Sequence, residues 1–227
     1  MISNLLEIKK GITSIIGGGG KTTLMHTLAR ELSDFGSVII TTTTHIMKSD
    51  VYPNVVTEDG VDNTLNITKA LNNNNCICVG SVCCGDKLSA PALSINELST
   101  LCDYLLVEAD GSKHLPLKAH LDNEPVIPID SNQTILVVGV DAIGQKLCDV
   151  THRYEKACEI LSCDESELVT DCLVSELIAT ENLHDKVVIN KCDDENSMAV
   201  AQALSKKIHS KCIIASLHKG EWYVSSN

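Results

Sequence analysis

The sequence predicts an α/β fold of three layers, in which helices cover both faces of a mostly parallel central sheet of about seven strands. Short apolar runs rich in Val and Ile recur along the chain without strict alternation, as expected for strands buried on both faces. Segments with helical periodicity separate these runs, and such alternation is typical of parallel sheets with right-handed crossovers. A glycine-rich turn joins the first expected strand to the first expected helix.

The expected elements follow one another along most of the chain. We expect strands at Ile12–Ile16, Val38–Ile40, Cys76–Val79, Tyr104–Val107, Ile135–Val138, Val187–Ile189 and Ile213–Ala215. We expect helices at Thr22–Phe35, Asp62–Leu71, Asn96–Cys102, Arg153–Leu161, Asp171–Ala179 and Ser197–Ile208. Prolines in Leu115–Pro128 lack the N–H that a helix or central strand requires. We therefore expect an ordered loop there, over the carboxyl edge of the sheet, where ligands bind.

Length and composition predict a single domain over residues 1–227 with an aliphatic core, because hydrophobic residues make up 44% and aromatic residues 3% of the chain. A formal net charge of −12 repels phosphate backbones, and few aromatic residues are present to stack on bases, so we expect no nucleic-acid partner. No apolar run approaches the roughly 20 residues that span a bilayer, and the first ten residues lack the apolar segment of a signal peptide. We expect no membrane partner and a cytoplasmic location.

The glycine-rich turn has the features of the phosphate-binding loop (P-loop) of nucleoside triphosphatases. Successive glycines let backbone N–H groups converge on a triphosphate, and the following helix start adds donors and a positive dipole end. Lys21 is placed to reach the β- and γ-phosphates, and the Thr22 hydroxyl to bind Mg²⁺. Ile15 stands where G-x-x-x-x-G-K-[ST] has its first glycine, so a plain flexible turn is the alternative. The residues expected to bind the phosphates are Gly17, Gly18, Gly19, Gly20, Lys21, Thr22 and Thr23.

A second motif, Asn190-Lys191-Cys192-Asp193, follows an apolar run and resembles the guanine-recognition signature of G proteins. An aspartate at this place can accept hydrogen bonds from the ring N–H and the exocyclic amine of guanine, a donor pair that adenine lacks. The lysine stem packs against the base, and the asparagine braces the loop. We expect Asn190, Lys191 and Asp193 to bind the base. The alternative is that Asn190 and Asp193 cap the helix expected from Ser197.

An acidic segment, Glu108-Ala109-Asp110-Gly111, ends the fourth expected strand. A carboxylate at the end of a buried strand suits Mg²⁺ binding or the positioning of water. Glu-x-x-Gly resembles the variant used by metallocentre-assembly GTPases, in which the Gly111 N–H would contact the γ-phosphate and couple hydrolysis to movement of the next loop. We expect Glu108 at the metal, and Glu108, Asp110 and Gly111 in catalysis with Lys21. An acidic turn without function is the alternative.

Four threonines, Thr41 to Thr44, follow the second expected strand and precede His45. Such residues are common in edge strands. Beside a phosphate-binding loop, however, one hydroxyl is well placed to touch Mg²⁺ or the γ-phosphate. We expect Thr43 to be a metal ligand, with Thr44 as the alternative, and His45 to be a packed or solvent-exposed side chain.

The chain contains 11 cysteines, which we expect to be reduced thiols. Cys76 and Cys78 share one face of an expected strand, and Cys83 and Cys84 lie just past its end. Four soft thiolates at one place could hold Zn²⁺ or Cu(I), or handle a sulfur or selenium species. Burial as small apolar side chains is the alternative, and it is the more common outcome.

Together, these segments resemble the YqeC family, described as selenium-dependent hydroxylase accessory proteins. The resemblance implies a cytoplasmic nucleotide-binding factor that serves the maturation of selenium-dependent molybdenum hydroxylases. Its partner would be such a hydroxylase or a cofactor-synthesis protein, and a homodimer is a possible assembly. The chain departs from the family pattern between Leu177 and Lys186, where it is short. The segments that carry the resemblance are Gly17–Thr23, Thr41–His45, Val107–Ser112, Leu115–Ala119, Glu124–Pro128, Val138–Gly144 and His152–Arg153.

Three functions remain open. The first is a Mg²⁺-dependent nucleoside triphosphatase that prefers GTP to ATP and couples a switch at Glu108–Lys118 to delivery of selenium or a related ligand. Its turnover would be slow without a partner, because no arginine finger is identifiable. The second is an ATP-dependent kinase or ligase for a small acid or selenium compound, and the third is a non-hydrolysing nucleotide-binding module. Lys113, Lys118 and Arg153 could face the nucleotide or an anionic substrate such as a selenium donor or molybdopterin phosphate.

Overall fold

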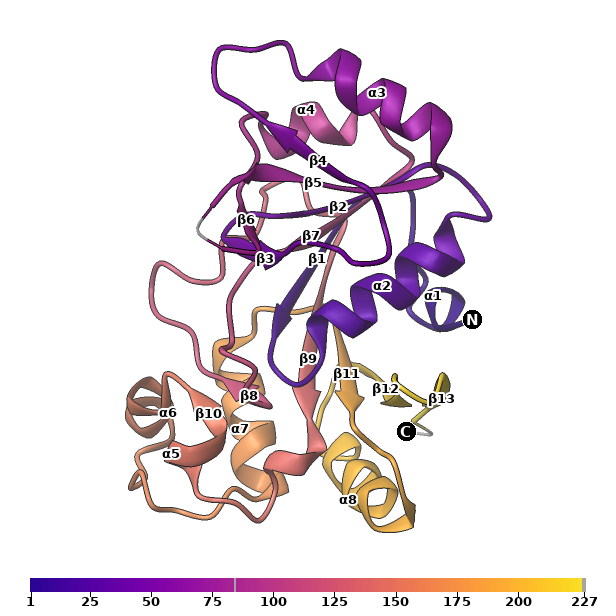
Figure 1. Cartoon of the computed structure of the whole chain (residues 1–227). Helices are drawn as coiled ribbons and strands as arrows, with labels where there is room; N and C mark the ends of the chain where they lie inside the picture. Colours follow the sequence, from indigo (N-terminus) through magenta and orange to yellow (C-terminus); the bar gives the residue numbers. More distant parts are fainter. Residues whose placement is uncertain (84, 226–227) are drawn as a thin grey trace. The chain divides into compact units, whose positions relative to one another are not determined.

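The computed structural model describes residues 1–83 and 85–225, and their contacts group into two compact units (Figure 1). Strand β1 (Gly11–Gly17) and helix α2 (Lys21–Leu32) each begin in one unit and end in the other. The single domain expected over residues 1–227 stays a prediction. The first unit contains Met1–Ile15, Met25–Gly111 and Val126–Gln133; the second contains Ile16–Leu24, Ser112–Pro125 and the described chain from Thr134 onward.

The first unit is built on mostly parallel strands in the order β1-β7-β2-β5-β6-β3, and β4 pairs with β5. The pairs among β1, β7, β2, β5 and β4 are parallel, whereas β6 pairs antiparallel with β5 and β3. The strands are β2 (Val38–Thr42), β3 (His45–Met47), β4 (Asn54–Thr57), β5 (Cys76–Val82), β6 (Lys87–Ser89) and β7 (Tyr104–Glu108). The helices are α1 (Ile2–Leu5), α3 (Thr64–Asn73) and α4 (Ile95–Ser99), together with most of α2.

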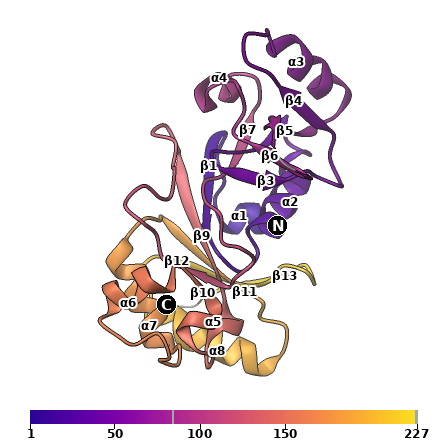
Figure 2. The same ribbon diagram turned by 60° about the vertical axis from the view of Figure 1, so that its left-hand side comes forward.

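Aliphatic side chains from both sheet and helices form the core of the first unit. Strands β2 and β7 are buried along their whole length, which explains their unbroken apolar sequence. Figures 1 and 2 show α3 and α4 on one side of this sheet and α2 on the other. One core cluster joins Ile67 of α3 and Leu98 of α4 to side chains of the sheet, namely Ile12, Ile39, Ile77, Val79, Leu105 and Val107.

The second unit contains the strand order β9-β11-β12-β13, in which only β13 is antiparallel to its neighbour. A separate parallel pair is formed by β8 and β10, with Leu117 opposite Thr151 and Lys118 opposite His152. Helix α7 packs against α6 and α8. The strands are β8 (Leu117–Lys118), β9 (Gln133–Gly139), β10 (Thr151–His152), β11 (Lys186–Asn190), β12 (Lys211–Ser216) and β13 (Glu221–Val224). The helices are η1 (Val140–Ala142), α5 (Leu147–Val150), α6 (Tyr154–Leu161), α7 (Asp171–Glu181) and α8 (Glu195–Ser205).

The predicted α/β class with mostly parallel strands is confirmed, and each of the expected strands and helices is present. The described residues hold eleven strands besides the β8–β10 pair, which exceeds the expected number of about seven. The additional ones, β3, β4, β6 and β13, are three or four residues long and partly exposed. The expected loop at Leu115–Pro128 also contains the two-residue strand β8. In the described part of the chain, no helix is both long and apolar enough to cross a bilayer.

Asp103 connects the starts of three neighbouring strands in the first unit through hydrogen bonds and an ion pair. It precedes β7, and its carboxylate accepts hydrogen bonds from the Ser37 N–H at 2.9 Å and the Ser37 hydroxyl at 3.0 Å, just before β2. The Lys10 ammonium, just before β1, lies 2.7 Å from the other carboxylate oxygen. The hydrogen bond from Lys10 and those from Ser37 lower the pKa of Asp103 from 3.8 to about 2. The charged form of Asp103 therefore stabilises the folded state.

We expect Asp103→Asn to lower the free energy of unfolding by about 1 kcal/mol at pH 7, a value reduced for the partial exposure of the pair. Because the folded-state pKa lies below the unfolded one, this contribution is present above pH 3.8 and disappears as the pH falls through about 2. Denaturant unfolding at pH 7 and at low pH measures it, with exposed Asp34→Asn as the matched control. An equal loss for Asp103→Asn at both pH values would contradict this assignment.

Candidate functional site

The glycine-rich turn lies in the second unit, between the end of β1 and the start of α2. Gly19 and Gly20 have φ values of +70° and +128°, which side chains rarely adopt. A Cβ at Gly19 would collide with the backbone of Gly139, and one at Gly20 would collide with the side-chain amide of Asn190. The turn therefore requires glycine both for its conformation and for its close approach to neighbouring segments.

Two of the backbone N–H groups that were predicted to bind phosphate already donate hydrogen bonds within the protein. The Gly18 N–H donates to the Val137 carbonyl at 2.9 Å, and the Gly19 N–H donates to the Leu115 carbonyl at 3.0 Å. These bonds fix the path of the turn against the end of β9 and the segment before β8. The N–H groups at the start of α2, which follow the turn, are the better candidates for a phosphate.

Lys21 is buried at the first position of α2, and its ammonium group is held over the turn. Its Nζ donates to the Gly17 carbonyl at 2.6 Å and to the Ser112 hydroxyl at 3.2 Å. Thr22 and Thr23, which follow, are exposed. The turn thus presents a cation and two hydroxyl groups at one helix start, the chemistry that phosphate and Mg²⁺ require.

Asn190, at the end of β11, connects the glycine-rich turn to two strand ends. Its buried side-chain amide donates to the Gly19 carbonyl at 2.7 Å, and its side-chain oxygen accepts a hydrogen bond from the Leu217 N–H at 3.0 Å. The alternative interpretation, in which Asn190 and Asp193 cap the next helix, is wrong. Asp194 caps α8 and forms a reciprocal capping box with Ser197.

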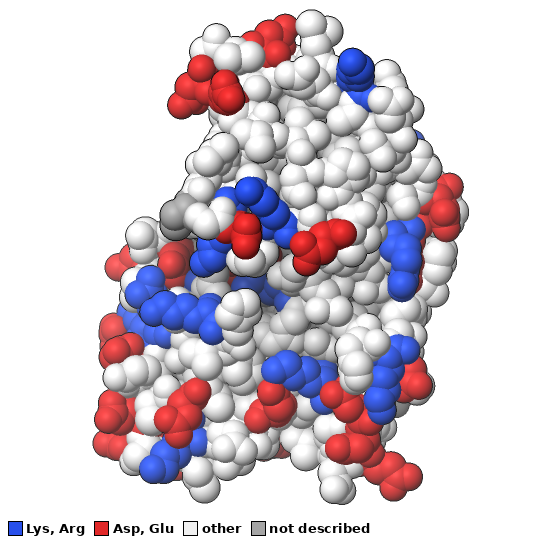
Figure 3. All heavy atoms as spheres, in the orientation of Figure 1, with Lys and Arg blue, Asp and Glu red and all other residues white. Residues whose placement is uncertain are grey.

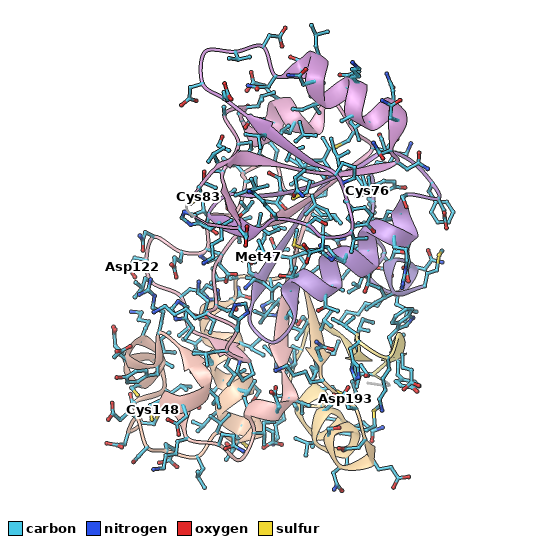
Figure 4. The ribbon with its side chains drawn as sticks, in the orientation of Figure 1. Met47, Cys76, Cys83, Asp122, Cys148 and Asp193 are labelled. Carbon is cyan, nitrogen blue, oxygen red and sulfur yellow. The ribbon has the colours of Figure 1, made fainter. Side chains whose placement is uncertain are left out.

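Lys191 and Asp193 line a cavity of about 460 Å³ in the second unit. Figure 4 shows Asp193 beside α8. The cavity falls within the size range of small-molecule sites, roughly 300–1,000 Å³. The Ser216 hydroxyl donates to the Asp193 carboxylate at 2.6 Å, and His218 Nδ1 lies 3.3 Å from the same oxygen. The Lys191 ammonium lies 2.7 Å from the carboxylate of Asp141. The other lining residues are Val140, Asp141, Ile143, Asp194, Asn196, Ser197 and Val200.

The predicted acidic residues and Thr43 lie in the first unit, at the carboxyl ends of β7 and β2. Glu108 and Asp110 are buried. The backbone N–H of Thr43 donates to the Glu108 carbonyl at 3.1 Å, and the Thr43 hydroxyl donates to the Val126 carbonyl at 2.8 Å. Gly111 is the last residue before the chain enters the second unit. The contact between Thr43 and Glu108 is thus made by their main chains, and their role as metal ligands stays a prediction.

The described residues contain no group of three or more His, Cys, Asp and Glu side chains that could hold a metal ion. Mg²⁺ takes few protein ligands, because it keeps several waters and binds substrate phosphates. Within the second unit, the exposed Thr22 carries a hydroxyl oxygen of the kind that Mg²⁺ binds. Within the first unit, Glu108 carries a carboxylate of that kind.

The cysteine pair on β5 is part of the core. Cys76 and Cys78 are buried, and burial raises the pKa of Cys76 to about 12 and that of Cys78 to about 11. Both side chains are therefore neutral thiols at pH 7, which are poor metal ligands and poor nucleophiles. Cys83 follows the strand, and Cys84 lies outside the described residues. These findings favour the structural alternative for Cys76 and Cys78.

Ser112 and Asp141 were not predicted from the sequence as site residues. Ser112 contacts Lys21, and Asp141 pairs with Lys191. Each follows a predicted strand closely, as Glu108 and Asp193 do. Their position after a strand end was the available signal, but a serine or a single aspartate there is too common to indicate a role.

The fold and these contacts define an α/β protein in which an Asn-Lys-x-Asp segment braces a glycine-rich turn. A family model described as "YqeC protein" matches residues 13–155. Over 155 residues the chain is 34% identical to "Uncharacterized protein YqeC" of Escherichia coli (strain K12), an alignment that covers 66% of this chain and 60% of that relative. The chain belongs to the YqeC family. The region matched by the family model includes the turn and Glu108–Gly111, whereas Asn190–Asp193 lies beyond it.

We expect Asn190→Ala to lower the free energy of unfolding by about 2–4 kcal/mol, because two buried groups, the Gly19 carbonyl and the Leu217 N–H, lose their partner. The matched control is Asn196→Ala on the exposed surface of α8, with an expected change within about 0.5 kcal/mol. Denaturant unfolding of both variants measures the difference. Equal stability of the two variants would show that the Asn190 contacts contribute nothing.

Proposed function

We propose that this protein is a Mg²⁺-dependent nucleoside triphosphatase that prefers GTP to ATP. The observation that supports this most strongly is the pair of hydrogen bonds made by Asn190, to the Gly19 carbonyl and from the Leu217 N–H. This amide joins the turn suited to phosphates to the segment suited to a base. A nucleotide needs both at a fixed separation.

The base would enter the cavity that Lys191 and Asp193 line. The Asp193 carboxylate is held in orientation by the Ser216 hydroxyl. It can accept hydrogen bonds from the ring N–H and the amine of guanine, whereas adenine presents no such pair. The stem of Lys191 would cover the base once its ammonium group leaves Asp141.

The phosphates would lie at the start of α2. The buried Lys21 ammonium would share their negative charge, and the backbone N–H groups of the first helical turn would donate to their oxygens. Mg²⁺, when bound, would neutralise charge on the β- and γ-phosphates, and Thr22 is its expected ligand on this turn. Glu108 and Thr43 remain the predicted metal ligands of the first unit, and Asp110 and Gly111 its further predicted catalytic residues.

The cellular role is proposed from the family resemblance. We propose an accessory factor for the maturation of selenium-dependent molybdenum hydroxylases that meets a client hydroxylase or a cofactor-synthesis protein and is able to form a homodimer. The free thiols of the described cysteines suit a reducing compartment such as the cytoplasm. Turnover is expected to be slow until the client is present.

Asp193→Asn tests the choice of base. We expect a loss of about 10- to 100-fold in GTP affinity, the equivalent of a charged hydrogen bond of about 1.5–3 kcal/mol, and a gain of affinity for xanthosine triphosphate. Equilibrium titration with GTP, ATP and xanthosine triphosphate in the presence of Mg²⁺ measures both effects. The exposed Asp149→Asn removes the same charge outside the cavity and should leave all three affinities unchanged.

If wild-type protein binds ATP as tightly as GTP and Asp193→Asn shifts neither affinity, guanine recognition is wrong. That outcome would favour the ATP-dependent kinase or ligase.

Lys21→Ala tests hydrolysis. We expect multiple-turnover phosphate release from GTP to fall by at least about 100-fold, because the variant lacks the ammonium group that offsets the developing phosphate charge. Lys146→Ala, a surface substitution, is the control and should retain the wild-type rate. Nucleotide binding by the wild-type protein without any turnover would instead support a non-hydrolysing module.

A further inference from the structure

Basic side chains gather around the β8–β10 pair of the second unit, although the chain as a whole carries a net charge of −12. Figure 3 shows Lys and Arg side chains close together on the left side of the molecule. Around this pair, the residues that we call the β8–β10 cluster are Lys113, Lys118, His152, Arg153 and Glu124. None of them lines the cavity beside Asp193.

Glu124 lies between two cations of the cluster. Its Oε2 atom is 2.9 Å from the ammonium of Lys118, whose side chain has no exposed surface. Its Oε1 atom accepts a hydrogen bond of 3.4 Å from Arg153 Nη2. Burial raises the pKa of Glu124, but the hydrogen bonds and charges of Lys118 and Arg153 outweigh burial and lower it overall. A carboxylate thus occupies the centre of the cluster.

The cluster has more positive than negative charge. Lys113, Lys118 and Arg153 are cations, and Glu124 is the carboxylate that pairs with two of them. Burial and the charges of Lys118, Arg153 and Lys113 lower the pKa of His152, against the opposing effect of Glu124, so its ring is neutral at pH 7. Among these residues, two positive charges therefore remain in excess, at a place where Lys118 is buried and Lys113 is exposed.

One hydrogen-bond donor of the Arg153 guanidinium group is available to a ligand. Its Nε atom is buried and has no hydrogen-bond partner among the described residues. A buried donor of this kind normally has a partner, and the planar guanidinium fork matches phosphate oxygens. The main-chain φ of Arg153 is +65°, and those of Lys113 and His114 are +50° and +65°. Non-glycine residues in this strained region concentrate at ligand sites.

We propose that the β8–β10 cluster binds the phosphoryl group of a small molecule, and that Glu124 occupies this site until the ligand displaces it. Without Glu124 the cluster has three cations, and a phosphate dianion offsets more of their charge than a single carboxylate does. Lys118 and Arg153 would pass from Glu124 to the phosphate oxygens, and Lys113 would approach from the exposed side. This proposal assigns Lys113, Lys118 and Arg153 to an anionic ligand other than the nucleotide, the second of the two roles expected for them from the sequence.

Two substitutions, Glu124→Gln and Lys113→Gln, test this proposal because we expect them to change the affinity for phosphate in opposite directions. Calorimetric titration with inorganic phosphate and, separately, with glycerol 2-phosphate measures affinity in the full chain. Glu124→Gln removes the competing charge, so we expect binding about tenfold tighter; Lys113→Gln removes an attracting charge, so we expect it several-fold weaker. Asp122→Asn, a neighbouring exposed acid (Figure 4), is the matched control and should change affinity less than twofold.

The probe that binds more tightly shows whether free phosphate or a phosphate ester is the better ligand, and binding of either one that persists in Lys21→Ala supports the site. Retained binding in Lys21→Ala would assign the phosphate to this cluster and not to the glycine-rich turn. Two results would overturn the proposal: no gain of affinity in Glu124→Gln together with no loss in Lys113→Gln, or a gain in Asp122→Asn as large as in Glu124→Gln. Because Lys113 is exposed, its variant is expected to fold even if Glu124→Gln does not.

Discussion

The side-chain amide of Asn190 holds the candidate site together. It bonds to the glycine-rich turn with one end and to the residue after β12 with the other. The Gly19 carbonyl and the Leu217 N–H are both buried, so leaving either one without the Asn190 amide as its partner is costly. The contact requires glycine at position 20, where a side chain would fill the place of the amide. Turn, β11 and β12 therefore constrain one another, and the lysine of the turn and the cavity beside Asp193 gain fixed positions from that constraint.

Two carboxylates of the second unit are each held in place by neighbouring side chains. Asp193 is held by Ser216 in the cavity beside α8, and Glu124 is held by Lys118 and Arg153 near β8. In the first case the carboxylate is available to recognise a ligand. In the second it neutralises cations that a ligand could use. Under the two proposals, the second unit would bind a nucleotide and a phosphorylated molecule, as a factor that couples nucleotide turnover to another substrate would need.

Most of the fold could be predicted, because the main strands are buried on both faces and their sequences show it. Runs such as Val38–Ile40 and Val187–Ile189 are continuous and β-branched. Strands such as β3 and β6 could not be predicted, since three partly exposed residues carry no local pattern and pair only through distant contacts. In the site, the bracing role of Asn190 followed from its motif. The bond from Gly19 to Leu115 and the position of Glu124 between Lys118 and Arg153 depend on tertiary contacts, which spacing does not encode.

The proposed function requires one molecule of a guanine nucleotide to span the glycine-rich turn and the cavity beside Asp193. Competitive equilibrium binding of GTP and ATP to the wild-type protein, with Mg²⁺ present, tests it most directly. We expect GTP to bind at least about tenfold more tightly than ATP, the effect of one charged hydrogen bond to the base. Equal affinity for the two nucleotides, or no binding of either at millimolar concentration, would contradict it.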